Sequence, residues 1–134
     1  MANAGARAIA FDLYDAIPAL RALRDRARLA LLTNNPSGAE VLNRHGLHTD
    51  VFHYVVIADP SARKPDPRAF QPLLDQLDLA VGEIAYIGDS ISADVEGALG
   101  VGMRSVWIDR WNDPLPLPPN VVRITSLLEL IDHC

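Results

Sequence analysis

Two carboxylates of the 134-residue sequence have a spacing that suits metal and phosphate chemistry. Asp89 and Asp94 are five positions apart and follow Gly88 in the pattern Gly-Asp-x-x-x-x-Asp. Two carboxylates at a strand-to-helix junction can meet one hard cation, and Mg²⁺ is commonly held by one or two carboxylates with water and substrate phosphate. Ser90 and the helix start add donors for an anion. The competing interpretation is that Asp89 or Ser90 only caps a helix and that Asp94 is a solvated surface residue.

A second polar segment, Thr33-Asn34-Asn35, follows an apolar run and precedes Pro36, which suits the first turn of a helix. A hydroxyl and free N–H groups at a helix start suit a phosphate oxygen, because the orphan donors and the helix dipole point toward it. Taken alone, the same segment more often marks a simple turn and cap.

Lys64 is a third candidate, and it precedes two prolines, Pro65 and Pro67, which stiffen its backbone. A point positive charge near a reacting anion stabilises the negative charge that accumulates there. A single Lys in a loop is usually solvent-exposed, so Lys64 indicates a site only in combination with the other groups.

Apolar runs typical of strands alternate with amphipathic helical stretches along the chain, which predicts a mostly parallel sheet covered by helices on both faces. The expected strands are Ala8 to Phe11, Leu29 to Leu32, Tyr54 to Ile57, Ile84 to Ile87, Ser105 to Ile108 and Val121 to Ile124. The expected helices are Pro18 to Arg28, Pro36 to His45, Pro67 to Leu77, Ile91 to Leu99 and Ser126 to His133, with Gly46 and Gly100 as left-handed residues after helix ends. We therefore expect one Rossmann-like, three-layer α/β/α domain over residues 1–134, with five to six strands and ligands bound at their carboxyl ends.

Composition limits the function classes. The formal net charge of −5 argues against binding to nucleic acid, and no apolar run reaches the length of a membrane span. A single cysteine, Cys134, cannot form an intramolecular disulfide, so a reducing, cytoplasmic location is expected.

The order Thr33, Lys64, then Asp89 and Asp94, each near the carboxyl end of an expected strand, resembles the haloacid dehalogenase-like (HAD) superfamily. The resemblance covers about four fifths of the chain, from Pro18 to the closing strand and helix. It implies a capless hydrolase core in which Mg²⁺ assists phosphoryl transfer. The roles that it implies are catalysis by Asp12, Lys64 and Thr33, substrate binding by Thr33, Asn34, Asn35, Lys64 and Ser90, and metal binding by Asp12, Asp89 and Asp94.

The first motif departs from the family pattern. In the family, an Asp at the end of the first strand is the nucleophile, which Asp12 matches, and phosphatases place a second Asp two positions later as acid and base. Tyr14 stands at that position, as in the dehalogenase branch, but the chain continues Asp15-Ala16-Ile17 instead of Gly-Thr. Without that acid, protonation of the leaving group falls to Asp15, Tyr14 or water. We expect a weak or selective phosphohydrolase, because positioned acid–base catalysis contributes roughly 10² to 10⁴-fold.

The first interval is also short, because only twenty residues separate Asp12 from Thr33. Relatives carry a small hairpin and often a cap domain there, so a natural deletion, an engineered one and a degenerate fragment would all give this pattern. A more severe alternative places Asp12 in the segment that follows a cap, with no nucleophile strand at all. If the site is open, specificity comes from an adjoining subunit of a homo-oligomer or from a phosphorylated macromolecule in place of a small phosphorylated metabolite.

Other functions remain as alternatives. Tyr14 favours a 2-haloacid dehalogenase, although the acidic pair argues for the metal-dependent reaction. A catalytically silent binding or regulatory module and a receiver domain are the remaining candidates. The irregular spacing of His45, His48 and His53 gives a zinc site little support, and Trp111 is expected at the rim of the pocket.

Overall fold

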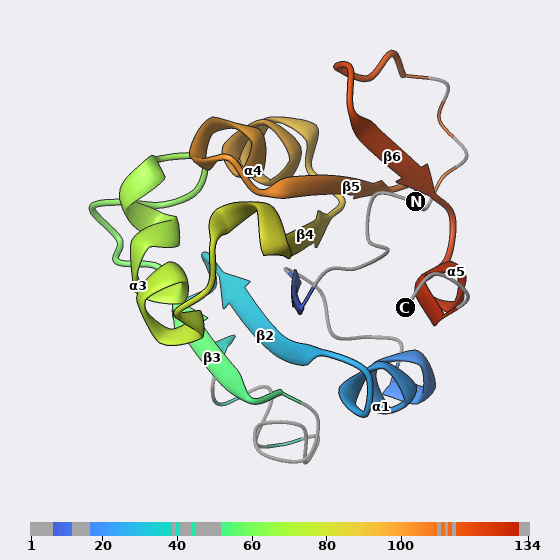
Figure 1. Cartoon of the computed structure of the whole chain (residues 1–134). Helices are drawn as coiled ribbons and strands as arrows, with labels where there is room; N and C mark the ends of the chain where they lie inside the picture. Colours follow the sequence, from blue (N-terminus) through green and yellow to red (C-terminus); the bar gives the residue numbers. More distant parts are fainter. Residues whose placement is uncertain are drawn as a thin grey trace.

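The computed structural model describes residues 7–11, 17–38, 40, 44, 52–109, 111, 113 and 115–131. These residues form a parallel sheet of six strands in the order β3-β2-β1-β4-β5-β6 (Figure 1). The strands are β1 (Ala8–Phe11), β2 (Arg28–Thr33), β3 (Tyr54–Ile57), β4 (Ile84–Gly88), β5 (Arg104–Ile108) and β6 (Val121–Ile124). The helices are α1 (Ile17–Arg24), α3 (Pro67–Leu77), α4 (Glu96–Val101) and α5 (Leu128–Ile131). The expected α/β architecture is confirmed, and the sheet has six strands, all parallel.

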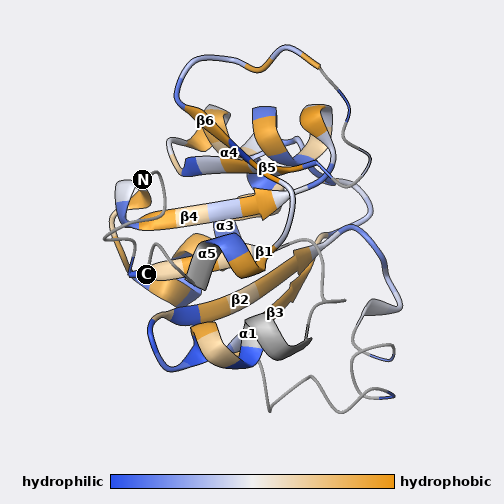
Figure 2. Cartoon of the chain, turned by 90° about the vertical axis from the view of Figure 1, so that its right-hand side faces the viewer, coloured by the Kyte–Doolittle hydropathy of each residue, from blue (hydrophilic) through white to orange (hydrophobic). Residues whose placement is uncertain are grey.

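Side chains alternate between the two faces of the sheet and build two separate cores. Ile9, Leu29 and Ile87 face the layer of α1 and α5, where they pack with Leu23 and Leu127. Their neighbours in the strands face the layer of α3 and α4: Ala10, Leu32, Tyr86, Phe70, Leu73 and Ala98 are members of this second core. Figure 2 shows the apolar colour along the strands, which lie between the two helix layers in Figure 1.

Helix α3 has the bounds that the sequence predicted, because strong signals fix both of its ends. The side chain of Asp66 accepts a hydrogen bond from the Arg68 N–H, and Pro67 occupies the first turn. At the other end Asp78 takes the left-handed conformation, with φ of 49°, and its N–H bonds the Leu74 carbonyl.

The expected helix Ile91 to Leu99 begins at the predicted residue, but its first turn is of another type and its end lies further along the chain. It begins with a wide π-type turn, Ile91–Val95, and continues as α4 to Val101. Gly100 was wrongly expected to end it, because the left-handed residue is Gly102, with φ of 89°. The Gly102 and Met103 N–H groups both bond the Ala98 carbonyl, and this closure buries the Met103 side chain.

Two other helix predictions differ or fall partly outside the described residues. The first helix ends at Arg24 and not at Arg28, because Arg28 already pairs with Ala8 as the first residue of β2. Most of the expected helix 36–45, together with Gly46 and residues 132–134, lies outside the described residues.

The connection between β1 and β2 holds no cap domain. Phe11 ends β1, only five residues precede α1, and α1 leads directly into β2. The short interval expected from the sequence therefore corresponds to a single crossover helix.

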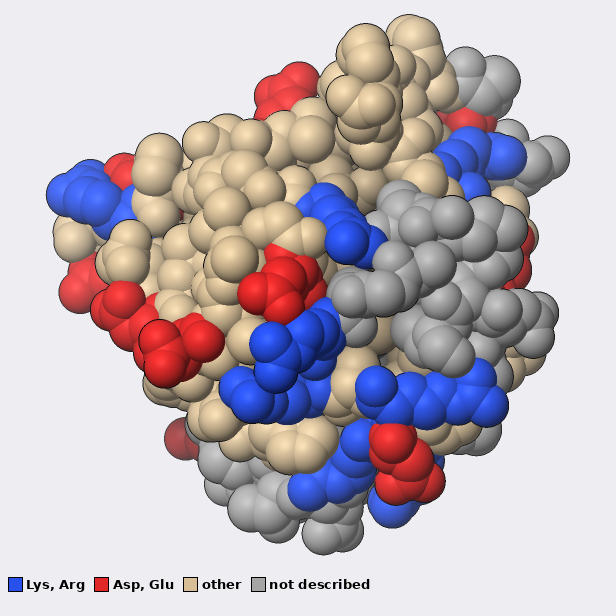
Figure 3. All heavy atoms as spheres, viewed as in Figure 1, with Lys and Arg blue, Asp and Glu red and all other residues tan. Residues whose placement is uncertain are grey.

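No described helix has the length and apolar character needed to cross a membrane. On the face drawn in Figure 3, basic side chains gather mainly in the lower part, with acidic side chains among them. That the protein does not bind nucleic acid stays a prediction.

Candidate active site

The carboxyl ends of neighbouring strands bring the sequence-predicted groups together. Thr33 ends β2, Gly88 ends β4, and Lys64 lies in the loop that follows β3. Asp12 follows β1, the strand between β2 and β4, but lies outside the described residues, as do Tyr14 and Asp15. The roles of these three residues stay predictions.

Lys64 is buried and not exposed as an isolated loop lysine would be: 5% of the residue is accessible. Its ammonium Nζ donates to Asp94 Oδ1 at 2.7 Å and to the Tyr86 hydroxyl at 2.9 Å, and lies 3.3 Å from the Leu32 carbonyl oxygen. A buried ammonium needs such partners, because loss of hydration is costly without hydrogen bonds and an opposite charge. The chain therefore holds a positive charge in a fixed place at this edge of the sheet.

Asn34 ties the loop that carries Lys64 to the end of β2. Its side-chain Oδ1 accepts from the Lys64 N–H at 3.0 Å, and its Nδ2 lies 3.4 Å from the Lys64 carbonyl oxygen. Asn34 thus positions Lys64 through its backbone, a role that the sequence did not predict for it. Its proposed contact with substrate stays a prediction.

Thr33 and Asn35 organise the turn after β2. The Thr33 hydroxyl accepts from the Asn35 N–H at 3.0 Å, and Asn35 Oδ1 accepts from the Ser37 N–H at 2.9 Å. The structure therefore confirms that this segment forms a turn. Because the Thr33 hydroxyl acts as an acceptor in this turn, its O–H can still donate a second hydrogen bond.

The turn after β4 folds back on itself through Asp94. Asp94 is fully buried, and its Oδ2 accepts from the Ser90 N–H at 3.1 Å while Oδ1 binds Lys64. The Ser90 hydroxyl accepts from the Ala93 N–H at 3.1 Å, so Ser90 caps the π-type turn. Gly88 is required beside this carboxylate, since a Cβ at that position would lie closer than 3.0 Å to Asp94 atoms. Asp94 is thus not the solvated surface residue of the competing interpretation.

Asp89 differs from Asp94 because its carboxylate is exposed. Among the described residues, no donor bonds this carboxylate, and no three His, Cys, Asp or Glu side chains gather as a ready metal cluster. The exposed Asp89 carboxylate still offers the hard oxygen donors that Mg²⁺ prefers. The described residues fit a Mg²⁺ site that keeps several waters, with Asp89 as its accessible protein ligand.

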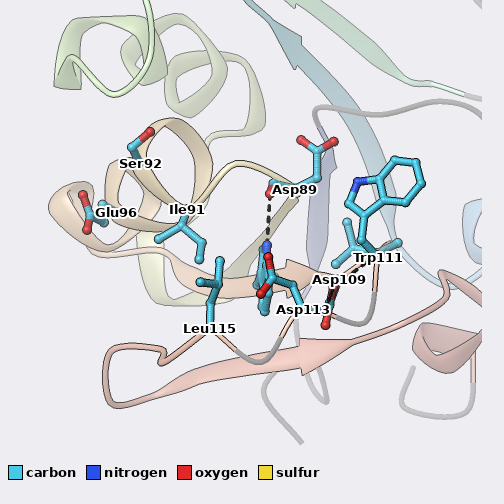
Figure 4. Close-up of a pocket in the computed structure, with 10 residues that line it drawn as sticks. Asp89, Ile91, Ser92, Glu96, Asp109, Trp111, Asp113 and Leu115 are labelled. Carbon is cyan, nitrogen blue, oxygen red and sulfur yellow. Dashed lines mark hydrogen bonds between the residues drawn. The ribbon is translucent and has the colours of Figure 1, made fainter.

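Two residues of the site escaped sequence reasoning. Tyr86, on β4, places its hydroxyl between Lys64 Nζ and the Leu32 carbonyl oxygen, the latter at 3.3 Å. Trp107, on β5, donates its indole N–H to the Asp89 carbonyl oxygen at 3.0 Å (Figure 4). The signal that could have found both is that a buried Tyr hydroxyl or Trp N–H needs a polar partner.

Asp109 fixes the loop that follows β5. It is 3% exposed and accepts from the N–H groups of Trp111, at 3.2 Å, and Asp113, at 2.9 Å, while Arg123 Nε donates to it at 2.9 Å. Burial by itself raises the pKa of this carboxyl group. The Asp113 N–H, the Arg123 guanidinium and the Trp111 N–H outweigh burial and hold the pKa below its ordinary value.

A hollow of about 400 Å³ opens beside Asp89, between the ends of β4 and β5 and the loop after β5. Trp107 forms part of it, and Trp111 lies at its edge with 88% of its surface exposed. Figure 4 shows Ile91 and Leu115 on its other side. Trp111 therefore lines a pocket next to the candidate metal ligand.

The model of one protein family, described as haloacid dehalogenase-like hydrolase, matches residues 6–102. Among curated relatives, a 5-amino-6-(5-phospho-D-ribitylamino)uracil phosphatase of Escherichia coli K12 is 31% identical over 121 residues, covering 84% of this chain and 49% of that protein. The chain spans about half the length of the curated relatives it matches over most of its own length.

Two solved structures illustrate the similarity of fold. A HAD phosphatase from Thermococcus onnurineus is 36% identical with a TM-score of 0.80, covering 90% of this chain and 56% of that one. A 2-haloacid dehalogenase from Pseudomonas syringae is 27% identical with a TM-score of 0.76, covering 88% and 50%.

Proposed function

The chain belongs to the haloacid dehalogenase-like hydrolase family, and from this premise we propose that it is a weak or selective Mg²⁺-dependent phosphohydrolase. The observation that carries the proposal is the buried Lys64 ammonium, held by Asp94 at the end of the turn that begins with the exposed Asp89. A fixed cation and a metal ligand at one edge of the sheet suit a substrate whose reacting group is a phosphate dianion.

The metal site of the proposal consists of Asp12, Asp89 and Asp94. Asp89 brings the exposed carboxylate and is the direct ligand, whereas Asp94 already binds Lys64 and the Ser90 N–H and acts mainly through its charge. Mg²⁺, when bound, neutralises charge on the phosphoryl oxygens. Thr33, Asn34, Asn35, Lys64 and Ser90 are the proposed phosphate-binding residues.

In the proposed reaction, a carboxylate oxygen of Asp12 attacks phosphorus and the ester P–O bond breaks. The leaving oxygen takes a proton from Asp15, Tyr14 or water, because Tyr14 stands where phosphatases of the family place an acid. Water then attacks the aspartyl phosphate, which releases inorganic phosphate and restores Asp12. Lys64 offsets the negative charge that grows on the phosphoryl oxygens in both steps.

The proposed substrate is a small phosphorylated metabolite or a phosphorylated macromolecule, and the proposed unit is one core domain over residues 1–134. Because no cap separates β1 from β2, the described residues offer little to exclude water above the site. An adjoining subunit of a homo-oligomer would supply that cover for a small substrate. Selectivity for a small substrate by a monomer in sedimentation would contradict this need for a cover.

The test is phosphate release from a panel of phosphomonoesters and acetyl phosphate, with Mg²⁺ and with a chelator. We expect Mg²⁺-dependent turnover that Asp12→Asn abolishes, and weaker Mg²⁺ binding by Asp89→Asn in calorimetry. Asp75→Asn, an exposed carboxylate on α3, is the matched control and should keep both properties. Magnesium binding without any turnover would favour a catalytically silent module.

A second candidate, 2-haloacid dehalogenation, is favoured by Tyr14 and by the similarity to the Pseudomonas syringae dehalogenase. In that reaction the Asp12 carboxylate would displace halide from the substrate carbon. Halide release from 2-haloacids in the presence of chelator, with no phosphate release, would replace the phosphohydrolase proposal.

A further inference from the structure

The hollow beside Asp89 is suited to hold the part of a substrate that leaves when phosphate is transferred. Asp89 lines this hollow and is also the proposed metal ligand, so the two sites are continuous. Because Lys64 is buried, the body of a substrate whose phosphoryl group lies at Asp89 and Lys64 has to extend away from the Lys64 side. The hollow is the described cavity next to that position, with a volume of about 400 Å³.

The hollow has apolar side chains on both of its sides, and some of them are exposed (Figure 4). The structure has five exposed large hydrophobic side chains among the described residues, and two of them, Trp111 and Leu115, line this hollow. Trp111 is 88% exposed, and Ile91 adds a further apolar surface. Exposed apolar side chains gathered at a cavity mark a binding surface more often than scattered single ones.

On the side of the hollow that carries Trp111, hydrogen bonds hold the described backbone in place. Asp109 binds the N–H groups of Trp111 and Asp113 and is itself bound by Arg123 of β6. Trp107 bonds the Asp89 carbonyl oxygen from the floor of the same hollow. A ligand would therefore not have to order the described backbone that carries the Trp111 indole.

The other lining groups are acidic. Asp89, Glu96 and Asp113 contribute carboxylates, whereas the described lining includes no Lys or Arg, and the Asp109 carboxylate is offset by Arg123. This charge repels an anionic leaving group and attracts a cationic one. An indole beside carboxylates also complements an organic cation, because the ring face attracts positive charge.

We propose that this hollow selects phosphomonoesters whose leaving group has an aromatic or flat apolar body and a positively charged amine. The apolar body lies between Trp111 on one side and Leu115 on the other, and the carboxylates of the lining, Glu96 and Asp113 among them, attract the amine. This inference rests on the proposed function only for the phosphate half of the substrate.

The test uses three phosphates of para-substituted phenols, in which the side chain ends in an amine, a methyl group or a carboxylate. They are tyramine O-phosphate, 4-ethylphenyl phosphate and the phosphate of 3-(4-hydroxyphenyl)propionate. The intrinsic reactivity of the ester bond is nearly equal in the three substrates, so differences in kcat/KM measure how the hollow recognises the para side chain. We expect the amine to exceed the carboxylate by roughly tenfold, since two partly exposed charge contacts contribute about that much. Equal values for the three substrates would overturn the inference while leaving the phosphohydrolase intact.

Variants separate the two features of the hollow. Trp111→Ala should lower the ratio of kcat/KM for 4-ethylphenyl phosphate to that for acetyl phosphate by roughly tenfold, because the contact between the indole and the aryl ring is lost. Glu96→Gln and Asp113→Asn should reduce the preference for amine over carboxylate. Leu128→Ala removes a side chain that is 59% exposed on α5, outside the hollow, and should change neither ratio.

A binding measurement separates failure of this inference from failure of the proposed function. If no aryl phosphate is hydrolysed, the hollow can still be tested by calorimetric titration of tyramine into the parent protein and into the Trp111→Ala variant. Binding that weakens in Trp111→Ala would support the hollow without the phosphatase reaction. Equal affinity for tyramine and 3-(4-hydroxyphenyl)propionate would overturn the inference.

Discussion

Lys64 and Asp94 form an ion pair of 2.7 Å between Nζ and Oδ1, with 1% and 0% of their side chains exposed. Asp94 also binds the Ser90 N–H, and Lys64 is tied through its backbone to Asn34. The pair therefore connects the loop after β3 with the turns after β2 and β4. This connection joins the parts of the site that are far apart in the chain.

Removing one partner of this pair should destabilise the protein strongly. Lys64→Met leaves the Asp94 carboxylate buried without its ammonium, and Asp94→Leu does the converse. We expect each variant to lower the free energy of unfolding by about 3 to 5 kcal/mol, as for other buried pairs that lose one charge. Urea denaturation of both variants at neutral pH measures this loss.

The double variant Lys64→Met with Asp94→Leu is the informative control. It removes both charges together, so we expect its free energy of unfolding to fall by much less than the sum of the two single losses. Simple addition of the two single losses would contradict the view that each charge is costly mainly without its partner.

Tyr86 is expected to position Lys64 for the proposed reaction. Tyr86→Phe removes a hydroxyl that accepts from Lys64 Nζ at 2.9 Å, so the ammonium becomes less well held. We expect a loss of about 1 to 2 kcal/mol in stability. We also expect kcat to fall roughly tenfold with little change in KM, because a displaced charge mainly weakens transition-state stabilisation.

Tyr54→Phe provides the matched control, since Tyr54 is a half-buried tyrosine on β3 that packs against the same core. It should leave kcat and KM as in the parent protein. A loss of stability in Tyr86→Phe with unchanged kcat would assign Tyr86 a purely structural role.

The sequence was sufficient to predict the strands and the candidate polar residues that follow β2, β3 and β4, because hydrophobic periodicity and turn residues are local signals. Thr33, Asn34, Lys64, Asp89 and Asp94 were identified in this way. The structure then shows which of them are in contact: Asn34 and Asp94 both hold Lys64. Sequence spacing could not predict these contacts, because the residues lie in loops after three different strands and meet only when the sheet forms.

The contacts of Tyr86 and Trp107 were not predictable for a related reason. Periodicity indicates that both side chains are buried, but the partner of a buried polar atom depends on strand order and register. Trp107 reaches Asp89 because β5 pairs with β4, where Gly88 is in register with Trp107. The end of α4 at Gly102 was missed because two glycines in the segment offered the same local signal.

Gly88 should tolerate no side chain, because the Asp94 carboxylate occupies the space that a Cβ would need. We expect Gly88→Ala to lower stability by about 1 to 3 kcal/mol, as overpacking does elsewhere, and to weaken Mg²⁺ binding measured by calorimetry. Gly100→Ala is the matched control, since nothing lies within 4 Å of a Cβ there and Ala favours the α4 helix. It should raise stability by about 0.5 to 1 kcal/mol. Equal stability of the two variants would contradict the close approach of Gly88 and Asp94.

Asp109 should make the protein sensitive to acid. Its pKa lies below the ordinary 3.8 in the folded state, so the folded protein binds this proton less readily than the unfolded chain. The stability that Asp109 contributes is therefore fully present above pH 3.8 and is lost as the pH falls through the lower folded value. Denaturation midpoints measured at descending pH should show this loss, and Asp109→Asn should flatten it while lowering stability near neutral pH.

Arg123→Gln tests the cause of this depressed pKa. The guanidinium of Arg123 is a principal donor to Asp109, so its removal should move the Asp109 pKa upward and shift the loss of stability to higher pH. Titration of the Asp109 carboxyl group by NMR measures the pKa directly in the parent protein and in the variant. An unchanged pKa in Arg123→Gln would assign the depression to the N–H groups of Asp113 and Trp111 alone.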